Sequence, residues 1–315
     1  MNENAPGRAD SKGPAFDIDV DDIEVKVEVG APLDPRLDAA LAIGIDSGAT
    51  LVKICVQDHG DTLHFASWRS PSHDRSHALL DRLQPERIGL TGCGAAEIAA
   101  GLTRHAPTLL EFDAWGRGAD VLLAEMGQKP AEPYLLVSIG TGTSILRVEG
   151  DRVERTGGTA LGGGTALGLG LALTGCTSHE ELARLAARGN RGGVDLLISD
   201  IYEATEVPIA DEATAASFGK LARSLDTLGG VGAPSKPEDL AAAIMGLVAE
   251  NIALLCHAHA RLAGVKTIVY GGSTLLENPR LVETIRLLTT LLGFDAIVLP
   301  RSGHAGAIGA MLLSA

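Results

Sequence analysis

The stretch IDSGATL (residues 45–51) aligns without gaps on IGTGTSI (residues 139–145). Each stretch is a short turn that contains glycine and joins two apolar segments, so the same strand–turn–strand pattern occurs twice in the chain. Repetition of one supersecondary unit is typical of a duplicated fold. The sequence therefore predicts two similar lobes whose matching turns point into one cleft.

The segments around these turns predict an α/β fold. The first copy contains predicted strands at 41–46, 51–56 and 62–68, a helix at 74–84, a strand at 87–92, a helix near 95–103, a strand at 108–112 and a helix from about 115 to 127. The second copy begins with strands at 134–140, 144–150 and 151–157, and it ends with strands at 266–270 and 294–300. We expect a first lobe at 41–132 and a second at 133–315.

Several sequence signals predict where the remaining elements begin and end. Ser235-Lys236-Pro237-Glu238 has the pattern of a capping box that opens an amphipathic helix, and Gly264 would end that helix. Asn278-Pro279 predicts the start of another helix, and a terminal helix is expected within 303–313. Residues 1–40 form an N-terminal extension, for which we expect disorder at 1–15 and a half-exposed strand at 16–29.

The composition narrows the class of function. The formal net charge is −14 and the pI is about 5.0, which disfavours nucleic acid and anionic membranes as partners. We find no signal peptide and no continuous apolar run of membrane-spanning length, so the sequence predicts a cytoplasmic protein. The four cysteines are scattered without a C-x-x-C pair, and we expect buried free thiols.

The first candidate site is the turn Ser47-Gly48-Ala49-Thr50 with Asp46 before it and Lys53 after it. A tight turn of this kind points backbone N–H groups and a hydroxyl at one place, which suits phosphate oxygens. Asp46 at the end of the preceding strand would hold Mg²⁺ through water, and Lys53 would add a positive charge. Alone, an Asp before a Gly-containing turn is more often only a turn former.

The second candidate site is the matching turn Gly140-Thr141-Gly142-Thr143-Ser144. Two facing turns suit a polyphosphate, so the repeat strengthens the functional interpretation of both. Gly140 stands where the first copy has Asp46, and the second turn therefore carries no carboxylate. A general base that would deprotonate an acceptor hydroxyl must come from elsewhere.

Glu111 is the best available carboxylate for that role. It ends the apolar run TLLEF, and ligands of open α/β sheets bind at strand ends. The alternative is that Glu111 and Asp113 merely cap the helix that follows. Spacing alone favours neither interpretation.

Two further segments complete the candidate site. Arg155 lies at the edge of a glycine-rich stretch that runs to Gly170, and its guanidinium suits a carboxylate; the alternative is a solvated arginine. We expect the glycine-rich stretch to close over a ligand. Gly271-Gly272-Ser273 follows a predicted buried strand and would pack flat against a nucleotide base.

Nine stretches in family order resemble the type II pantothenate kinases. They are AIGIDSGATLVKI (42–54), LTGCGAAEIA (90–99), LLEFDAWGRG (109–118), YLLVSIGTGTSIL (134–146), VERTGGTALGGGTALGLGLALTG (153–175), DLLISDIY (195–202), ASFGKL (216–221), IVYGGS (268–273) and GHAGAIGA (303–310). Ala49 and Cys93 stand where the family usually has glycine, and Ala49 requires a negative φ.

The resemblance implies an actin-like fold with ATP in the cleft between the lobes, a homodimer, and Mg²⁺- and ATP-dependent phosphorylation of pantothenate in coenzyme A synthesis. It implies that Glu111 is the catalytic base and that CoA or acyl-CoA is a regulator. The implied nucleotide-binding residues are those of the two turns with Asp46 and Lys53, together with Gly271, Gly272 and Ser273. Arg155, Gly158 and Thr141 are the implied pantothenate-binding residues.

Alternatives remain within the same superfamily. Pantetheine is a related substrate. An ATPase that activates an acyl-CoA dehydratase has the same fold, but such activators carry cysteines that bridge subunits through an iron–sulfur cluster, and the scattered cysteines argue against this class. A catalytically inactive sensor of CoA-type ligands is disfavoured because Asp46, Glu111 and Arg155 are all present.

Overall fold

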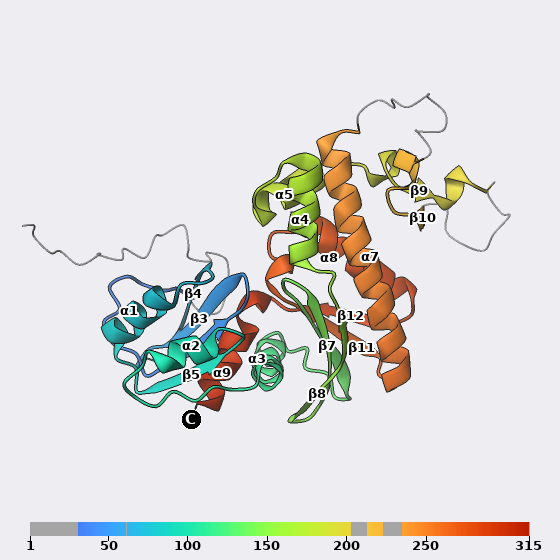
Figure 1. Cartoon of the computed structure of the whole chain (residues 1–315). Coiled ribbons are helices and arrows are strands. Elements are labelled where there is room, and N and C mark those ends of the chain that lie inside the picture. Colours follow the sequence, from blue (N-terminus) through green and yellow to red (C-terminus); the bar gives the residue numbers. More distant parts are fainter. Residues whose placement is uncertain (1–30, 61, 203–212, 223–234, 315) are drawn as a thin grey trace, which may run out of the picture.

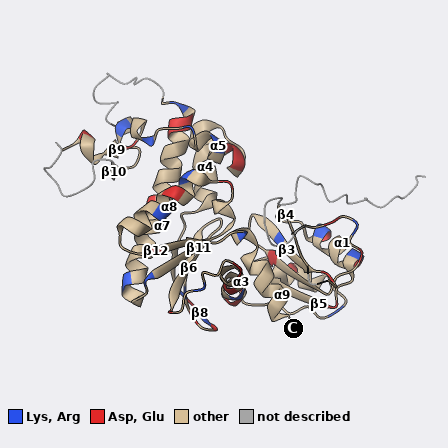
Figure 2. Cartoon of the chain, turned by 180° about the vertical axis from the view of Figure 1, so that it is seen from behind, with Lys and Arg blue, Asp and Glu red and all other residues tan. Residues whose placement is uncertain are grey.

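Figure 1 presents the computed structural model, which describes residues 31–60, 62–202, 213–222 and 235–314. The strand predicted at 16–29 lies outside these residues. Two mixed sheets, each flanked by helices, form the body of the molecule. Charged residues of both signs lie mainly on outer helices and turns, whereas the central strands carry few of them (Figure 2).

The first sheet has the strand order β1 (Ala31–Pro32), β4 (Leu63–Arg69), β3 (Leu51–Gln57), β2 (Ala42–Ser47) and β5 (Arg87–Thr91). Strands β2, β3 and β4 are antiparallel neighbours, and β5 is parallel to β2. Helices α1 (His73–Leu83) and α2 (Ala95–Ala100) contribute to the apolar core on one side of this sheet. The strand β1 adds the end of the N-terminal extension to the sheet edge.

The second sheet repeats the same arrangement. Its order is β8 (Arg152–Thr159), β7 (Thr143–Glu149), β6 (Tyr134–Ile139), β11 (Thr267–Gly271) and β12 (Asp295–Val298). In both sheets an antiparallel triplet is followed by a parallel strand, β5 beside β2 and β11 beside β6. The duplication predicted from the two turns is confirmed by this common topology.

Helices α3 (Glu111–Glu125) and α9 (Ala305–Leu313) pack against each other and belong to a core that includes residues of both sheets. Helix α9 also lies very close to the first sheet, and glycines on two of the strands allow this approach. A methyl group at Gly44 on β2 would meet the carbonyl of Ala307, and one at Gly89 on β5 would meet that of Ala310. The small residues of the last helix are therefore a packing requirement.

Helix α7 (Pro237–Ala263) packs on the second sheet with α4 (Gly163–Thr174), α5 (His179–Ala186) and α8 (Pro279–Leu291). Of the described helices, α7 alone has the length and mean apolar composition of a membrane span, although Glu250 and Asn251 interrupt its apolar run. Its most apolar window is 61% buried within the fold, as in the core helix of a globular protein.

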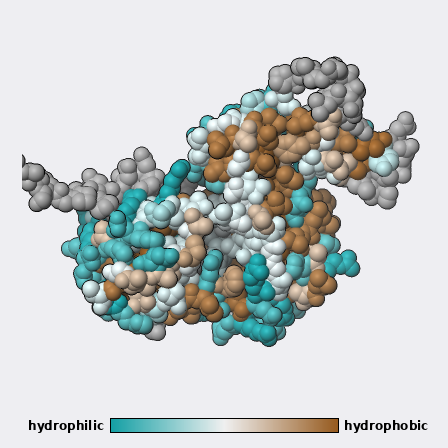
Figure 3. Space-filling view, viewed as in Figure 1, coloured by the Kyte–Doolittle hydropathy of each residue, from teal (hydrophilic) through white to brown (hydrophobic). Residues whose placement is uncertain are grey.

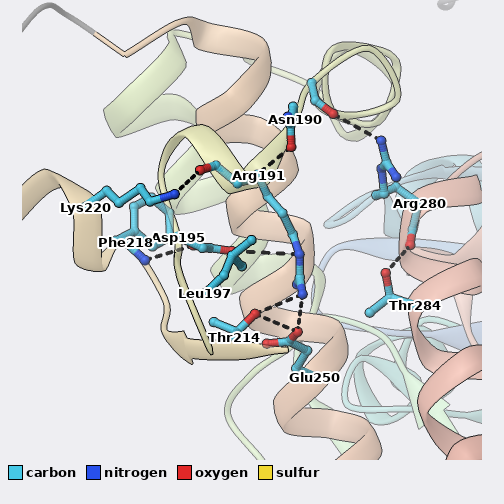
Figure 4. A network of polar contacts seen from close by, with 12 residues as sticks. Asn190, Arg191, Asp195, Leu197, Thr214, Phe218, Lys220, Glu250, Arg280 and Thr284 are labelled. Carbon is cyan, nitrogen blue, oxygen red and sulfur yellow. Dashed lines mark hydrogen bonds and ion pairs between the residues drawn. The ribbon is translucent and has the colours of Figure 1, made fainter. Parts of the chain in front are cut away.

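A small polar unit attaches to α7 through Arg191 and Glu250 (Figure 4). It contains the short strands β9 (Leu196–Leu197) and β10 (Thr214–Ala216) and the 3₁₀ helices η2 (Arg191–Gly193) and η3 (Ile198–Asp200). The Arg191 guanidinium is 2.5 Å from the Glu250 carboxylate and donates to the Thr214 hydroxyl at 2.8 Å. Buried Asp195 accepts from the Phe218 amide at 2.9 Å, which ties the two ends of this unit together.

The predicted helix ends are confirmed at Gly264, which has the left-handed conformation, and at Asn278, whose side chain accepts from the Leu281 amide. The predicted capping box is wrong, because Lys236 is the N-cap of α7 and no side chain caps it. The predicted strand at 108–112 is also wrong. Thr108 alone bridges to β5, and Glu111 is already the first residue of α3.

Candidate active site

The first turn holds Asp46 close to Lys53. The Gly48 amide donates to the Leu51 carbonyl at 3.0 Å, and the Ser70 hydroxyl donates to the Gly48 carbonyl at 2.7 Å. The Lys53 Nζ lies 3.2 Å from Asp46 Oδ2 in an ion pair that is largely buried, with the two side chains 15% and 4% exposed. Ala49 is not among the described non-glycine residues with positive φ, as its side chain requires.

Two glycines make room for the Asp46 carboxylate. Gly92 has φ +86°, and a methyl group there would come within 2.8 Å of Asp46 Oδ1. A methyl at Gly306 would come equally close to Oδ2, and it would also lie 3.3 Å from the indole nitrogen of Trp115. The carboxylate therefore lies between the loop after β5 and the start of α9.

The second turn is anchored to α4 and to the 3₁₀ helix η4 (Ser273–Leu275). The Gly140 carbonyl accepts from the Gly163 amide at 2.7 Å and from the Thr274 hydroxyl at 2.9 Å. The Thr141 carbonyl accepts from the Gly164 amide at 2.9 Å. The glycine-rich stretch thus forms the end of β8 and the beginning of α4, and its closure over a ligand stays a prediction.

The two turns meet. The hydroxyls of Thr50 and Thr141 share a hydrogen bond of 2.8 Å between residues 91 positions apart in the sequence. Both side chains are exposed to solvent at this contact. The structure therefore brings together the two predicted cradles, with Asp46 and Lys53 beside the first.

Glu111 reaches the same region from the first turn of α3. The backbone of 107–109 runs beside β5, where the Leu109 amide donates to the Leu90 carbonyl at 2.7 Å and the Thr91 hydroxyl donates to the Leu109 carbonyl at 3.0 Å. Glu111 as a residue is exposed, but surrounding protein atoms partly displace water from its carboxylate. This desolvation raises the pKa of Glu111 above its ordinary value of 4.5; the negative charge of Asp46 raises it further, and Lys53 opposes the rise.

Arg155 owes its direction to a β-bulge in β8. Across the β7–β8 pair, Leu146 faces Arg155 and Ile145 faces Gly157, so Thr156 is an extra residue. The Arg155 guanidinium carbon lies 6.0 Å from the ring centre of Phe112, the neighbour of Glu111. A methyl group at Gly158 would come within 2.5 Å of the Thr143 carbonyl and within 2.8 Å of this guanidinium, which explains the glycine there. Arg155 therefore lies near the first turn of α3, which also carries Glu111.

The segment Gly271-Gly272-Ser273 lies at the end of β11 and leads into η4, which contacts the second turn through Thr274. Gly272 has φ +119°, and its carbonyl accepts from the Ser302 hydroxyl at 3.2 Å. A methyl at Gly271 would come within 3.0 Å of the Trp115 ring. The close backbone packing accounts for both glycines.

Sequence reasoning missed Phe112 and Trp115. They follow Glu111 at positions i+1 and i+4 of α3, and they contact Arg155 and the Gly271 segment respectively. The motif LLEFDAWGRG contains both aromatic residues, but their partners lie more than 40 positions away in the sequence. Cys55, Cys176 and Cys256 are buried as expected, whereas Cys93 is exposed, with its sulfur 3.6 Å from the Ser47 carbonyl.

The residues present fit a mostly hydrated Mg²⁺ rather than a protein-enclosed ion. No group of three or more His, Cys, Asp or Glu side chains suited to a metal occurs in the described part of the chain. Asp46 is a single carboxylate with one oxygen already paired to Lys53. One carboxylate with water and substrate phosphates is a common way to hold Mg²⁺.

Comparison with known proteins agrees with this geometry. The model of the Fumble family matches residues 114–313. The type II pantothenate kinase of Staphylococcus haemolyticus is 36% identical over 274 residues, which are 87% of this chain and all of that protein. The enzyme of Staphylococcus aureus strain USA300 is 34% identical over 273 residues, 87% of this chain and 99% of that protein.

Solved structures share the fold at lower identity. The (R)-2-hydroxyglutaryl-CoA dehydratase component A of Acidaminococcus fermentans has a TM-score of 0.56 and 19% identity, over 86% of this chain and 96% of that one. The ROK family glucokinase of Streptomyces griseus, in complex with glucose and AMPPNP, has a TM-score of 0.52 and 16% identity, over 87% and 99%. The fold is therefore the two-lobed actin-like fold predicted from the sequence. By its sequence matches, the chain belongs to the Fumble family of type II pantothenate kinases.

Proposed function

We propose that this chain transfers the γ-phosphoryl group of ATP to the hydroxyl of pantothenate, giving 4′-phosphopantothenate and ADP. Family membership supports the overall reaction. The observation that carries the residue assignment is the convergence of the two turns at the Thr50–Thr141 contact, beside the Asp46–Lys53 pair and Glu111.

In this proposal the paired turns bind the polyphosphate. The backbone amides and hydroxyls of 47–50 and 140–144 would donate to phosphate oxygens, and Lys53 would neutralise part of the charge. Gly271 to Ser273 would face the adenosine. Asp46 and water would hold Mg²⁺, which supplies charge neutralisation to the phosphates.

Arg155 and Glu111 would act on the acceptor. The Arg155 guanidinium pairs with the pantothenate carboxylate, with Gly158 and Thr141 beside it, and this fixes the distance of the hydroxyl from Glu111. The Glu111 carboxylate takes the hydroxyl proton as the oxygen forms its bond to the γ-phosphorus. The bond to the ADP oxygen breaks, and Glu111 leaves the step protonated.

The acceptor is tested by ADP release with Mg²⁺-ATP, comparing pantothenate, pantetheine and no acceptor. We expect turnover that depends on pantothenate. Turnover with pantetheine alone would reassign the substrate, and equal ADP release without an acceptor would favour an ATPase. Nucleotide binding without any turnover would favour a ligand sensor.

The proposed assembly is a cytoplasmic homodimer. Figure 3 shows an apolar area over α4 and α7, where Leu171, Leu254 and Leu262 are 56%, 52% and 87% exposed. A second copy would bury these side chains. Analytical ultracentrifugation of the parent chain should therefore find a dimer. Leu254→Lys should raise the fraction of monomer, and the variant monomer should be as thermally stable as the parent monomer. A monomeric parent chain would overturn this assembly.

We further propose that CoA or acyl-CoA regulates the enzyme. Inhibition of ADP release by added CoA or acyl-CoA tests this proposal.

A further inference from the structure

We propose that His259 is a positioning residue for the substrate carboxylate, acting through the bulge that directs Arg155. The inference rests on the proposed function, since it assigns His259 to the pantothenate side of the site. His259 is half-buried on α7, on the opposite face of the second sheet from α3.

The two faces of β8 show how the bulge separates Arg155 from His259. Val153 faces α3, because a methyl at Gly116 of that helix would overlap its side chain. Arg155, two residues later, faces the same side and lies near Phe112. Without a bulge Gly157 would face α3 too, but the extra residue Thr156 turns it towards α7.

Gly157 is where His259 touches the strand. A methyl group at Gly157 would overlap the imidazole of His259, so the ring lies directly against the backbone of the bulge. The bulged residue itself is held by its side chain, since the Thr156 hydroxyl donates to the Ile145 carbonyl at 3.3 Å. The imidazole therefore fixes how far this backbone can move towards α7.

The consequence for the substrate follows from the next residue. Gly158 lies under the Arg155 guanidinium and pairs with Ser144 of the second turn. A shift of Gly157 towards α7 would move Gly158 with it and withdraw the support beneath the guanidinium. Misplacement of a substrate-holding group by an ångström is enough to cost a large factor in rate or affinity.

The chain offers a matched control in His257. This residue lies on the same helix two positions earlier, and its ring packs edge-on against Phe294 at 5.2 Å instead of against β8. We expect His259→Ala to raise the KM for pantothenate about tenfold while leaving kcat and the KM for ATP within about twofold. His257→Ala should leave all three unchanged, and His259→Phe, which keeps a flat ring against Gly157, should restore the KM for pantothenate.

A double-mutant cycle gives a second test. Gly157→Ala should raise the KM for pantothenate in the parent chain, because the new methyl meets the imidazole, and should cost much less in the His259→Ala background. Additive effects, or equal changes in the KM values for both substrates, would overturn the proposal. Arg155→Ala serves as the reference. If it does not raise the KM for pantothenate, the proposed carboxylate contact itself is wrong. If it raises this KM but His259→Ala leaves it unchanged, only the role of His259 is refuted.

Discussion

Thr50 of the first turn and Thr141 of the second, which occupy different positions of the repeated unit, are joined by a hydrogen bond of 2.8 Å between their hydroxyls. The turns come from separate sheets that share an antiparallel triplet followed by a parallel strand. In the proposed function, nucleotide binding exchanges this bond for bonds to phosphate oxygens.

The two hydroxyls should therefore be energetically coupled. Thr50→Val and Thr141→Val each remove one hydroxyl at nearly constant volume, and each should weaken ATP binding several-fold. Because a hydrogen bond contributes about 1 kcal/mol, the double variant should depart from additivity by roughly fivefold in Kd. Isothermal titration of ATP into the four proteins measures this coupling. Strict additivity would show that the contact does not influence nucleotide binding.

The pH dependence of turnover should report the environment of Glu111. Its pKa is raised by desolvation and by Asp46, and only the deprotonated carboxylate can accept the hydroxyl proton. Activity should thus be lost as the pH falls through a value above 4.5, the ordinary pKa of a glutamate. Lys53→Met removes the opposing positive charge and should move this acidic limb to higher pH. A limb that stays in place would mean that another group controls it.

Arg155 should not be replaceable by lysine. Its guanidinium lies across Gly158 and near the Phe112 ring, a geometry that suits a planar fork better than a compact ammonium. Arg155→Ala and Arg155→Lys should both raise the KM for pantothenate by at least about tenfold, with the KM for ATP unchanged. Steady-state kinetics with each substrate varied separately decide the point. Full activity of the lysine variant would show that the site needs only a positive charge at position 155 and not the planar guanidinium.

The end of the N-terminal extension should contribute to stability rather than catalysis. Leu33 is fully buried in the core of the first sheet, and its amide donates to the Phe65 carbonyl at 3.0 Å. Leu33→Ala should lower the free energy of unfolding by about 2–5 kcal/mol, as buried leucine truncations do, with kcat unchanged in the folded protein. Exposed Asp38→Ala is the control. Equal denaturation midpoints for the two variants would contradict this role.

The sequence predicted the duplicated sheets because alternation and glycine turns are local signals, and those around residues 45–51 and 139–145 agree with each other. It misplaced Glu111 because TLLEF has the composition of a buried strand. In the structure Leu110 is 73% exposed, and only Thr108 bridges to β5. Whether a short apolar run pairs with a sheet or begins a helix depends on tertiary contacts that composition does not contain.

The direction of Arg155 was equally out of reach of the sequence. A strict alternation through 151–157 would put residues 155 and 157 on one face of the sheet. The extra residue Thr156 depends on hydrogen bonds to β7, and no local signal marks it.

The lobe boundary predicted near 132 stays a prediction. Helix α9, from the end of the chain, packs on β2 and β5 of the first sheet, so the lobes are not simply two consecutive halves of the sequence.

The central claim is that Glu111 is the general base in a site where both phosphate turns meet, and Glu111→Gln tests it most directly. The substitution keeps the size of the side chain and one hydrogen-bonding oxygen but cannot accept the proton. We expect the Kd for ATP to stay within about twofold of the parent value and pantothenate-dependent ADP release to fall by roughly 10²–10⁴-fold. Wild-type turnover in this variant would contradict the account.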